Sequence, residues 1–428
     1  MQYPNDLAGW LEYIERLHPS SIELGLERVR RVQAALDVPK SCPLFIVGGT
    51  NGKGSTCTML ESILYAAGYR VGKYLSPHLL RYNERVRIAG RDATDEELIA
   101  GFEAVEAARG DVPLTYFEFT TLAAWVTFAR AQLDALILEV GLGGRLDAVN
   151  IFDPDCSIIT SVDIDHVDFL GNSREQIGWE KAHIYRPGRP AICSEPNPPA
   201  RLLEYAASIG ADLRLIGRDF GYEADRQQWL YWGPSGRRSG LPHPALRGAN
   251  QLLNASACLA ALEAMYERLP VSGQAIRAGL LSAQLPGRFQ VLHGRPTVIL
   301  DVAHNPHAAA VLHENLAAMP GYRKTLAVVG MLKDKDIPGV FAHLKGCVDR
   351  WFVSTLDNPR GATAAELAQA LAEAQAGGTI ECFATPEEAW RRARGEAGES
   401  DRILVFGSFY TVAEVMQARE AASSPLPR

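Results

Sequence analysis

The sequence has no C-x-x-C pair among its seven cysteines, which are scattered from Cys42 to Cys382. An odd number of cysteines without close pairs argues against a disulfide framework and against a thiolate zinc site. We therefore expect them to be small buried side chains in a reducing compartment, the cytoplasm. The first residues, Met1 to Asp6, also lack the basic start and the apolar stretch of a secretory signal, so export is not expected.

Two further absences limit the kinds of partner that the protein is expected to bind. No uninterrupted apolar run reaches the roughly 20 residues that a membrane helix requires, so no membrane partner is expected. The formal net charge is −7, which gives no reason to expect the concentrated basic surface that a nucleic-acid backbone requires. Hydrophobic residues make up 47% of the chain and charged residues 22%, which excludes disorder. With 428 residues, the chain is expected to form two domains that act on a small molecule.

Apolar runs alternate with helical patterns in the first half of the chain. The apolar runs predict strands at 44–47, 135–140, 157–160 and 190–193. The stretches between them predict helices at 53–67, around 122–131, and at 173–185. This alternation is typical of a parallel sheet with helical crossovers, and therefore of an α/β fold.

The pattern repeats after a break near Leu285-Pro286-Gly287-Arg288, where a helical region from Asn250 to Ala283 ends. We place the domain boundary there. The prediction is an N-terminal parallel-sheet domain over 1–288 and a smaller C-terminal Rossmann-like α/β domain over 289–428. The second domain has predicted strands at 298–302, 326–329, 351–354 and 403–406, and a helix capped by Thr385. The Gly/Pro/Arg-rich stretch from Gly233 to Pro244 predicts a surface loop.

The strongest local signal is the segment Gly48-Gly49-Thr50-Asn51-Gly52-Lys53-Gly54-Ser55, which lies between the first predicted strand and its helix. Glycines let backbone N–H groups turn toward one anion, the helix N-terminus adds partial positive charge, and Lys53 can reach terminal phosphates. The strict G-x-x-x-x-G-K-[ST] spacing is not met, because residue 47 is valine and a glycine separates Lys53 from Ser55. The alternative is a glycine-rich turn with a solvated lysine. In its strand-loop-helix context, the segment predicts a phosphate-binding loop. The N-terminal domain is therefore predicted to be a P-loop ATPase domain.

Acidic residues follow two of the predicted strands. A nucleoside triphosphate requires a metal ion, and Mg²⁺ prefers hard oxygen ligands. Glu139 closes the apolar strand at 135–140, where an acid is costly unless it is paired or metal-bound. A half-buried salt bridge is the alternative for Glu139. Asp163-Ile164-Asp165-His166 follows the strand at 157–160, so it is expected at the same carboxyl edge, where open parallel sheets bind ligands.

Four segments occur in order along the chain: Gly49–Ser55, Ser76–Leu79, Glu139–Ala148 and Asp301–Pro306. Together they resemble the folylpolyglutamate synthase family, whose members are related to the Mur peptidoglycan ligases. The chain is similar in particular to bacterial bifunctional members that are also dihydrofolate synthases. The resemblance runs from about Trp10 to the final strand and helix. It implies an ADP-forming ligase that joins L-glutamate to dihydropteroate or a reduced folate through an acyl phosphate, with ATP and Mg²⁺.

The resemblance also implies roles for individual residues. The ATP phosphates would be held by Thr50, Asn51, Gly52, Lys53, Gly54 and Ser55, and the nucleotide contacted by Asn254, Arg288, Asp301 and His304. One or two Mg²⁺ ions would be ligated by Ser76, Glu139, His166 and Lys181, the last as a carbamate. The catalytic residues would be Lys53, Glu139, His166 and Lys181. The pteroate would lie against Glu23-Leu24-Gly25, Thr115-Tyr116-Phe117-Glu118 and Leu146-Asp147-Ala148.

Several alternatives stay open at this point. The Tyr116-Phe117 pair suits a flat pterin ring, but it suits core packing equally well. Lys181 is also explained as a helix-surface lysine paired with Glu180. Glu23 stands where related proteins carry Asp, a change that keeps the carboxylate. The same loop would serve a P-loop kinase or nucleotide hydrolase, or a non-catalytic nucleotide-sensing module. We expect a monomer.

Overall fold

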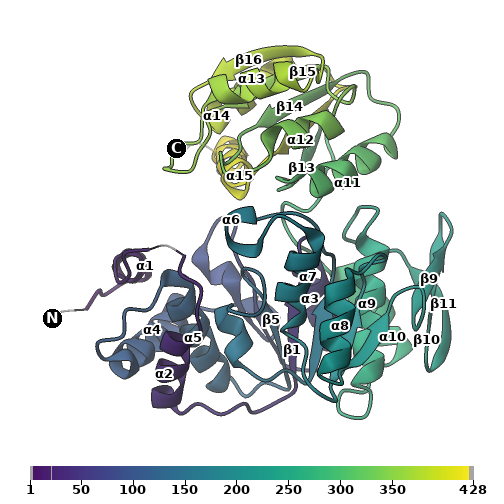
Figure 1. Cartoon of the computed structure of the whole chain (residues 1–428). Coiled ribbons are helices and arrows are strands. Elements are labelled where there is room, and N and C mark those ends of the chain that lie inside the picture. The colour runs from purple at the N-terminus through teal and green to yellow at the C-terminus, as the bar shows by residue number, and fades with distance from the viewer. Residues whose placement is uncertain (1–2, 21, 424–428) are drawn as a thin grey trace. The chain divides into compact units, whose positions relative to one another are not determined.

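The computed structural model describes residues 3–20 and 22–423 and divides into two compact units (Figure 1). One unit consists of Met1–Ala245 and Leu252–Ala283, and the other of Leu246–Gln251 and Gln284–Arg428. Within the described ranges, no helix has the length and apolar character that crossing a lipid bilayer requires.

The first unit is built on an eight-stranded sheet with the order β4-β3-β2-β5-β1-β6-β7-β8. The strands from β2 to β8 in this order run parallel, whereas β3 and β4 extend one edge in antiparallel fashion. Every residue of β1 is buried, as a central parallel strand requires. The strands are β1 (Leu44–Gly48), β2 (Val71–Tyr74), β3 (Val86–Ile88), β4 (Arg91–Asp92), β5 (Ala135–Glu139), β6 (Cys156–Ile159), β7 (Pro190–Cys193) and β8 (Asp212–Leu215).

Helices cover both faces of this sheet. On one face, α5 shares a core with alternate residues of β1 and β5, and α1, α2 and α4 pack against it. On the other face, α3 crosses β1, β2 and β5, and α10 packs against α3. The helices are α1 (Leu7–Glu15), α2 (Glu27–Leu36), α3 (Lys53–Ala66), α4 (Asp95–Arg109), α5 (Tyr116–Ala129), α6 (Val167–Leu170), α7 (Arg174–Ala182), α8 (Ala200–Ser208), α9 (Gln251–Ala264) and α10 (Gly273–Ser282), with 3-10 turns η1 (Tyr82–Arg85) and η2 (Ala148–Ile151).

A small antiparallel sheet in the first unit corrects one prediction. The stretch from Gly233 to Pro244, predicted as a surface loop, contains strand β11 (Gly236–Pro242). It pairs with β10 (Gln228–Gly233), which pairs in turn with β9 (Gly221–Ala224) (Figure 1). The Gly and Pro content marks the tight turn of this hairpin, whereas pairing with the aromatic-rich β10 decides the conformation of the rest. Cross-strand pairing here outweighs local composition.

The second unit contains a six-stranded sheet with the order β12-β13-β17-β14-β15-β16, in which only β12 is antiparallel to its neighbour. One face packs against α11, α12 and α13, and the other against α14 and α15. The predicted cap Thr385 accepts the Glu388 N–H at the start of α14. The elements are β12 (Gln290–Leu292), β13 (Thr297–Leu300), β14 (Thr325–Val329), β15 (Arg350–Ser354), β16 (Thr379–Phe383), β17 (Arg402–Phe406), α11 (Pro306–Ala317), α12 (Ile337–His343), α13 (Ala364–Glu373), α14 (Pro386–Glu396) and α15 (Phe409–Ser423).

The predicted α/β class is confirmed in both units. The main sheet of each unit is mostly parallel, and its strands are connected largely through helices. The carboxyl ends of β2, β5, β1 and β6 lie side by side in the first unit. Ligands of open parallel sheets bind at such an edge, so the segments that follow these four strands are the natural candidates for a site.

Candidate active site

The glycine-rich loop connects β1 to α3 at the carboxyl edge of the sheet. Gly49 and Gly52 have positive φ angles of 144° and 87°, which favour glycine. A Cβ atom on Gly52 would come within 2.6 Å of the Asn254 Oδ1, so the absence of a side chain lets α9 approach the loop. The structure therefore places Asn254, a predicted nucleotide contact, directly against the predicted phosphate loop.

The segment after β6 fixes the shape of this loop. The Ser161 carbonyl accepts the Thr50 N–H at 2.8 Å, and the Ser161 hydroxyl accepts the Asn51 N–H at 3.0 Å. Thr160 Oγ1 donates to the Asn51 carbonyl at 2.6 Å. The Thr50 hydroxyl donates to the Asp163 carbonyl and accepts the Asp163 N–H, both at 3.0 Å. Several backbone groups of the loop are therefore held in fixed directions before any ligand arrives.

Lys53 is the first residue of α3 and bends back over the loop. Its Nζ donates to the carbonyl oxygens of Gly49 and Thr50 at 3.0 and 3.1 Å. No carboxylate of the described chain lies within ion-pair distance of it. The ammonium group therefore lies above a glycine-rich turn at a helix N-terminus, where it can meet an anion.

The next two strands of the sheet bring Ser76 and Glu139 together. β2 and β5 are parallel neighbours, and the Ser76 N–H donates to the Glu139 Oε2 at 3.1 Å. The Glu139 side chain belongs to the buried set, with a relative exposure of 4%. Besides burial, Glu139 raises the pKa of Cys57 on α3 and Lys53 lowers it, so the Glu139 carboxylate lies within electrostatic range of the start of that helix. A buried carboxylate beside a hydroxyl-bearing residue suits a hard cation.

Lys181 on α7 is buried, with a relative exposure of 4%. The pKa of its amine is lowered to about 7, first by burial and then by the nearby Lys53 ammonium, whereas Asp165, Asp147 and Glu180 oppose the shift. This position is incompatible with the alternative of a helix-surface lysine. A Cβ on Gly144 would lie 2.6 Å from the Glu180 carbonyl, so the glycine lets the loop after β5 approach α7 this closely.

His166 begins the short helix α6 with φ 52° and ψ 46°, an uncommon conformation for a residue with a side chain. Its N–H is bonded to the Asp165 carboxylate at 2.8 Å, and Asp165 is within electrostatic range of Lys181. Leu170 at the other end of α6 lies against Gly143, where a Cβ would come within 2.7 Å. The loop that carries His166 is thus anchored on the loop after Glu139.

The predicted metal ligands fit Mg²⁺ better than a metal ion that takes all of its ligands from the protein. Among the residues that the structure describes, no group of three or more His, Cys, Asp or Glu side chains could hold a metal ion. Mg²⁺ keeps several water ligands and binds phosphate oxygens, so one or two carboxylates with a hydroxyl and an imidazole are sufficient.

Two of the three predicted substrate segments are joined by one arginine. Arg28 on α2 pairs with the Glu23 carboxylate and with the Glu118 carboxylate, the latter at 3.1 Å. His18 Nε2 also lies 3.3 Å from the Glu23 carboxylate. The segments 23–25 and 115–118 therefore lie together, although they are far apart in the sequence.

The segment 115–118 is also the start of α5. Thr115 caps the helix, and its side chain and that of Glu118 form a reciprocal capping box. Phe117 packs against Gly141, where a Cβ would come within 2.5 Å of the ring. Tyr116 and Phe117 are half-buried, so both keep an accessible face at this edge.

The third substrate segment follows the glycines after β5. Asp147 is buried, and its carboxylate accepts the Leu142 and Val149 N–H groups at 2.8 and 3.0 Å. Burial raises the pKa of Asp147 to about 7, even though these hydrogen bonds and Lys53 favour the ionised form. The carboxylate thus sets the path of the chain from the carboxyl end of β5 to η2.

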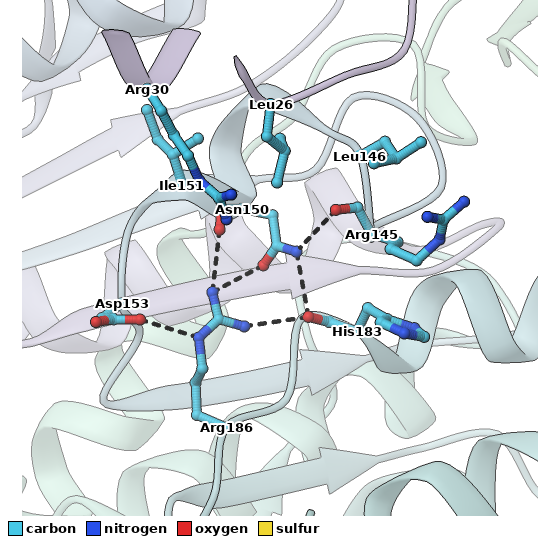
Figure 2. Close-up of a pocket in the computed structure, with 9 residues that line it drawn as sticks. All are labelled: Leu26, Arg30, Arg145, Leu146, Asn150, Ile151, Asp153, His183 and Arg186. Carbon is cyan, nitrogen blue, oxygen red and sulfur yellow. Dashed lines mark hydrogen bonds and ion pairs between the residues drawn. The ribbon is translucent and has the colours of Figure 1, made fainter.

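A pocket of ≈ 380 Å³ opens beside this segment (Figure 2). Of the predicted site residues, all of which are described, only Leu146 lines it, so the pocket does not include the glycine-rich loop. Figure 2 shows Arg186 among the lining residues, bonded to the Asp153 carboxylate and the Asn150 side chain at 3.0 Å each. Its lining residues are Leu26, Arg30, Arg145, Leu146, Asn150, Ile151, Asp153, His183 and Arg186.

The remaining predicted nucleotide contacts lie in the second unit. Asp301 follows β13, and its carboxylate accepts the N–H groups of Phe289 and Ala303 at 2.8 and 2.7 Å. Burial raises its pKa, while Arg288 lowers it. His304 Nδ1 lies 2.7 Å from the Val302 carbonyl. Arg288, Asp301 and His304 thus cluster at the carboxyl end of β13.

Sequence reasoning did not single out Thr160 and Ser161, which hold the phosphate loop. They follow β6, and β6 is next to β1 in the sheet although more than 100 residues separate them. The strand order was the missing information. A hydroxyl pair directly after a buried strand was the only signal in the sequence.

Two family models match the chain. The Mur ligase middle domain matches residues 47–262, and the glutamate ligase domain of Mur ligases matches residues 287–409. The chain is 49% identical over 424 residues to the dihydrofolate synthase/folylpolyglutamate synthase of Escherichia coli strain K12, covering 99% of this chain and 98% of the relative.

Solved structures agree with these matches. A structure of the E. coli FolC protein in complex with DHPP and ADP superposes with a TM-score of 0.94 at 48% identity, covering 99% of this chain and all of that one. A bifunctional folylpolyglutamate synthase/dihydrofolate synthase with Mn, AMPPNP and L-glutamate bound gives a TM-score of 0.90 at 48% identity, with 98% and 100% coverage.

Proposed function

Because the chain belongs to the Mur ligase family, among the bifunctional dihydrofolate synthase/folylpolyglutamate synthases, we propose that its phosphate loop, Glu139 and Lys181 form the centre at which ATP drives amide formation. The enzyme is an ATP-dependent ligase that joins L-glutamate to pteroates and folates. The observation that carries the assignment of residues is the convergence of Lys53, Glu139 and Lys181 at one carboxyl edge of the sheet.

The protein's part in the reaction is to position reactants and balance charge. A carboxylate oxygen of the pteroate or folate attacks the γ-phosphorus of ATP, and the bond to ADP breaks, which leaves an acyl phosphate. Lys53 and the loop N–H groups stabilise the negative charge on the transferred phosphoryl group. The glutamate amine then attacks the acyl carbon, loses a proton, and expels phosphate. No nucleophilic side chain is needed.

Magnesium would be held by Ser76, Glu139 and His166, where it would supply positive charge that offsets the charge of the phosphates. We assign Asn254 in the first unit, and Arg288, Asp301 and His304 in the second, to the nucleotide. Residues 1–288 are assigned to ATP and pteroate binding and residues 289–428 to the glutamate ligase domain. We also propose that the enzyme is a cytoplasmic monomer.

Lys181 is proposed to act as a carbamate. Carbon dioxide adds to a neutral amine, forming a C–N bond while the nitrogen loses a proton, and burial that lowers the pKa of Lys181 to about 7 favours that neutral form. A positive ammonium beside metal ligands would oppose the cation, whereas a carbamate reverses the sign of the charge. The product is a carboxylate on a long arm that can ligate magnesium directly or through water.

The three substrate segments are assigned to the pteroate moiety. Arg28 holds the segments 23–25 and 115–118 together, and Phe117 contacts the loop that leads to 146–148. The half-buried rings of Tyr116 and Phe117 suit a flat aromatic ligand. The pocket beside Leu146 adds the apolar side chains of Leu26 and Ile151 to this surface (Figure 2).

Substrate competition tests this assignment. Dihydropteroate and a reduced folate are expected to inhibit each other's ligation competitively, because the reacting carboxylate of each must occupy the same position at the phosphate loop. Each substrate's inhibition constant against the other should match its own KM. If dihydropteroate is neither ligated nor inhibitory while the folate is extended, the shared site and the dihydrofolate synthase assignment are both wrong.

A further inference from the structure

A buried arginine beside the segment 115–118 has no role in the assignments above. Arg85 ends η1 and has a relative exposure of 9%. Its Nε donates to His78 Nδ1 at 2.9 Å. Its guanidinium lies over the rings of Tyr82 and Tyr116, 5.6 and 5.5 Å from their centroids. The cation is therefore enclosed by aromatic and imidazole rings, with Tyr116 on the side of the predicted substrate segment.

No carboxylate pairs with this guanidinium in the part of the chain that the structure describes. Its sequence neighbour Glu84 accepts the backbone N–H groups of Leu79, Leu80 and Arg81 instead, at 2.8, 2.9 and 2.7 Å. Nη1 and Nη2 make no hydrogen bond with described residues. Neither belongs to the fully buried side-chain atoms without a hydrogen-bond partner, so both have some solvent-accessible surface. Both terminal nitrogens therefore remain accessible to a ligand.

Arg402 in the second unit is a useful comparison, since it is a buried arginine that also has no carboxylate partner among the described residues. It is 8% exposed, and its guanidinium lies 5.2 Å from the Tyr322 ring centroid. Its Nε donates to the Thr325 hydroxyl at 2.9 Å, and its Nη1 donates to the Leu316 and Met319 carbonyls at 2.8 and 3.2 Å. The hydrogen bonds and the ring contact of Arg402 are sufficient for a structural role. The Arg85 side chain has one hydrogen bond to a described residue, and a buried cation with so few partners is costly unless an anion binds it.

Arg85 lies by the predicted pteroate segments, whereas Lys53 lies at the glycine-rich loop. The Arg85 guanidinium is 5.5 Å from the ring centroid of Tyr116 in the segment 115–118. Burial raises the pKa of Tyr74, Asp147 adds to this shift and Arg85 opposes it, so Tyr74 is within electrostatic range of both residues. Lys53 Nζ instead donates to two carbonyl oxygens of the loop after β1. The two cations therefore face different parts of the proposed substrates.

We propose that Arg85, with His78 beside it, binds the non-reacting α-carboxylate of the terminal glutamyl residue of a folate. This inference rests on the proposed function. Dihydropteroate has one carboxylate, which must react at the phosphate loop, whereas a folate has a second carboxylate close to the reacting one. Because His78 Nδ1 accepts from Arg85, the neutral imidazole carries its proton on Nε2 and can donate to the same anion. Arg85 would therefore serve folate extension and not dihydropteroate ligation.

The test compares the two reactions in one variant. Arg85→Met keeps the length and apolar contacts of the side chain but removes its charge and donors. We expect kcat/KM for a monoglutamyl reduced folate to fall about 10- to 100-fold, the range for a lost hydrogen bond to a charged group, mainly through KM. Dihydropteroate ligation should change less than about threefold. Equal loss with both substrates, or no loss with the folate, would overturn the proposal.

Two controls keep the result interpretable. Arg402→Met removes a buried arginine of matched exposure and should lower stability without separating the two substrates. A folate analogue with a carboxamide in place of the α-carboxylate tests the unchanged protein, where a 10- to 100-fold loss in kcat/KM is expected and no loss contradicts the proposal. In Arg85→Met the analogue and the parent folate should react equally. An unchanged protein that ligates neither substrate would instead refute the proposed function.

Discussion

The first unit buries cations in two regions, and only one of these regions supplies carboxylates for them. Between α3 and strands β2 and β3, Lys73 Nζ lies 2.5 Å from the Glu61 carboxylate. Arg87 pairs with Glu61 at 3.0 Å and with Asp92 at 2.8 Å. Every charge in this group has a partner, and the group joins a helix to two strands.

The carboxyl edge of the same sheet differs. Lys53 and Arg85 lie there, and no described carboxylate is within ion-pair distance of either. Breaking a buried pair leaves an uncompensated charge, so a protein that tolerates unpaired cations at one edge needs anions from elsewhere. Paired charges therefore hold the fold, whereas the two cations at this edge are those to which we assign a phosphate and a carboxylate group.

The largest effect is expected from Lys53→Ala. Ligation should fall about 10³-fold or more, because we assign to this lysine the stabilisation of charge on the transferred phosphoryl group. The free energy of unfolding should change by less than about 0.5 kcal/mol, since Lys53 bonds only to carbonyls of its own loop. Steady-state ADP release and a urea titration measure the two quantities. Near wild-type turnover would remove the loop from the mechanism.

Lys181→Ala should come next, with a loss of about 10²-fold or more in kcat if the carbamate ligates the metal. Acetate or formate should restore part of the activity by occupying the vacated position, whereas chloride at the same ionic strength should not. Mass spectrometry of wild-type protein kept in bicarbonate should detect the added carbon dioxide. Full activity in Lys181→Ala would disprove the role.

In the paired region, Lys73→Met should affect stability and not chemistry. The change leaves the Glu61 carboxylate buried beside Arg87 alone, which should cost about 3–5 kcal/mol of unfolding free energy. The double variant Lys73→Met, Glu61→Leu should regain much of that loss. The kcat of the folded enzyme should stay within about threefold of wild type. A large loss of kcat at unchanged stability would erase the distinction between the two regions.

The smallest effect is expected at a surface pair. Arg31 Nη2 lies 3.2 Å from the Asp111 carboxylate, and both side chains are mostly exposed. Arg31→Ala should change the unfolding free energy by no more than about 0.5 kcal/mol, because solvent screens the pair. Kinetics with both substrates should be unaltered. A larger change would mean that this surface contributes in a way the structure does not show.

Local signals in the sequence predicted the features that depend on neighbouring residues. The strand at 44–47, the helix from Lys53 and the phosphate loop between them follow from apolar runs and glycines. The hairpin from Gln228 to Pro242 was missed, because its two strands form by pairing with each other and not from a local sequence pattern. The fully buried position of Lys181 was also hidden, since it depends on Gly144 approaching α7.

The role inferred for Arg85 required the assembled site. Its contacts, His78 and Tyr116, come from different segments, and only the folded chain shows that Glu84 is occupied by backbone N–H groups. A sequence alone pairs Glu84 and Arg85 as adjacent opposite charges. The geometry shows that this pairing does not occur.

The most direct test of the central claim is the dependence of ADP formation on the amine. Purified protein with ATP, Mg²⁺ and either dihydropteroate or a reduced folate should form ADP and ligated product in a 1:1 ratio when L-glutamate is present. Without glutamate, ADP formation should stop after about one equivalent per enzyme, because the acyl phosphate has no acceptor. Continuous phosphate release at the same rate without glutamate would contradict the account and identify a nucleotide hydrolase.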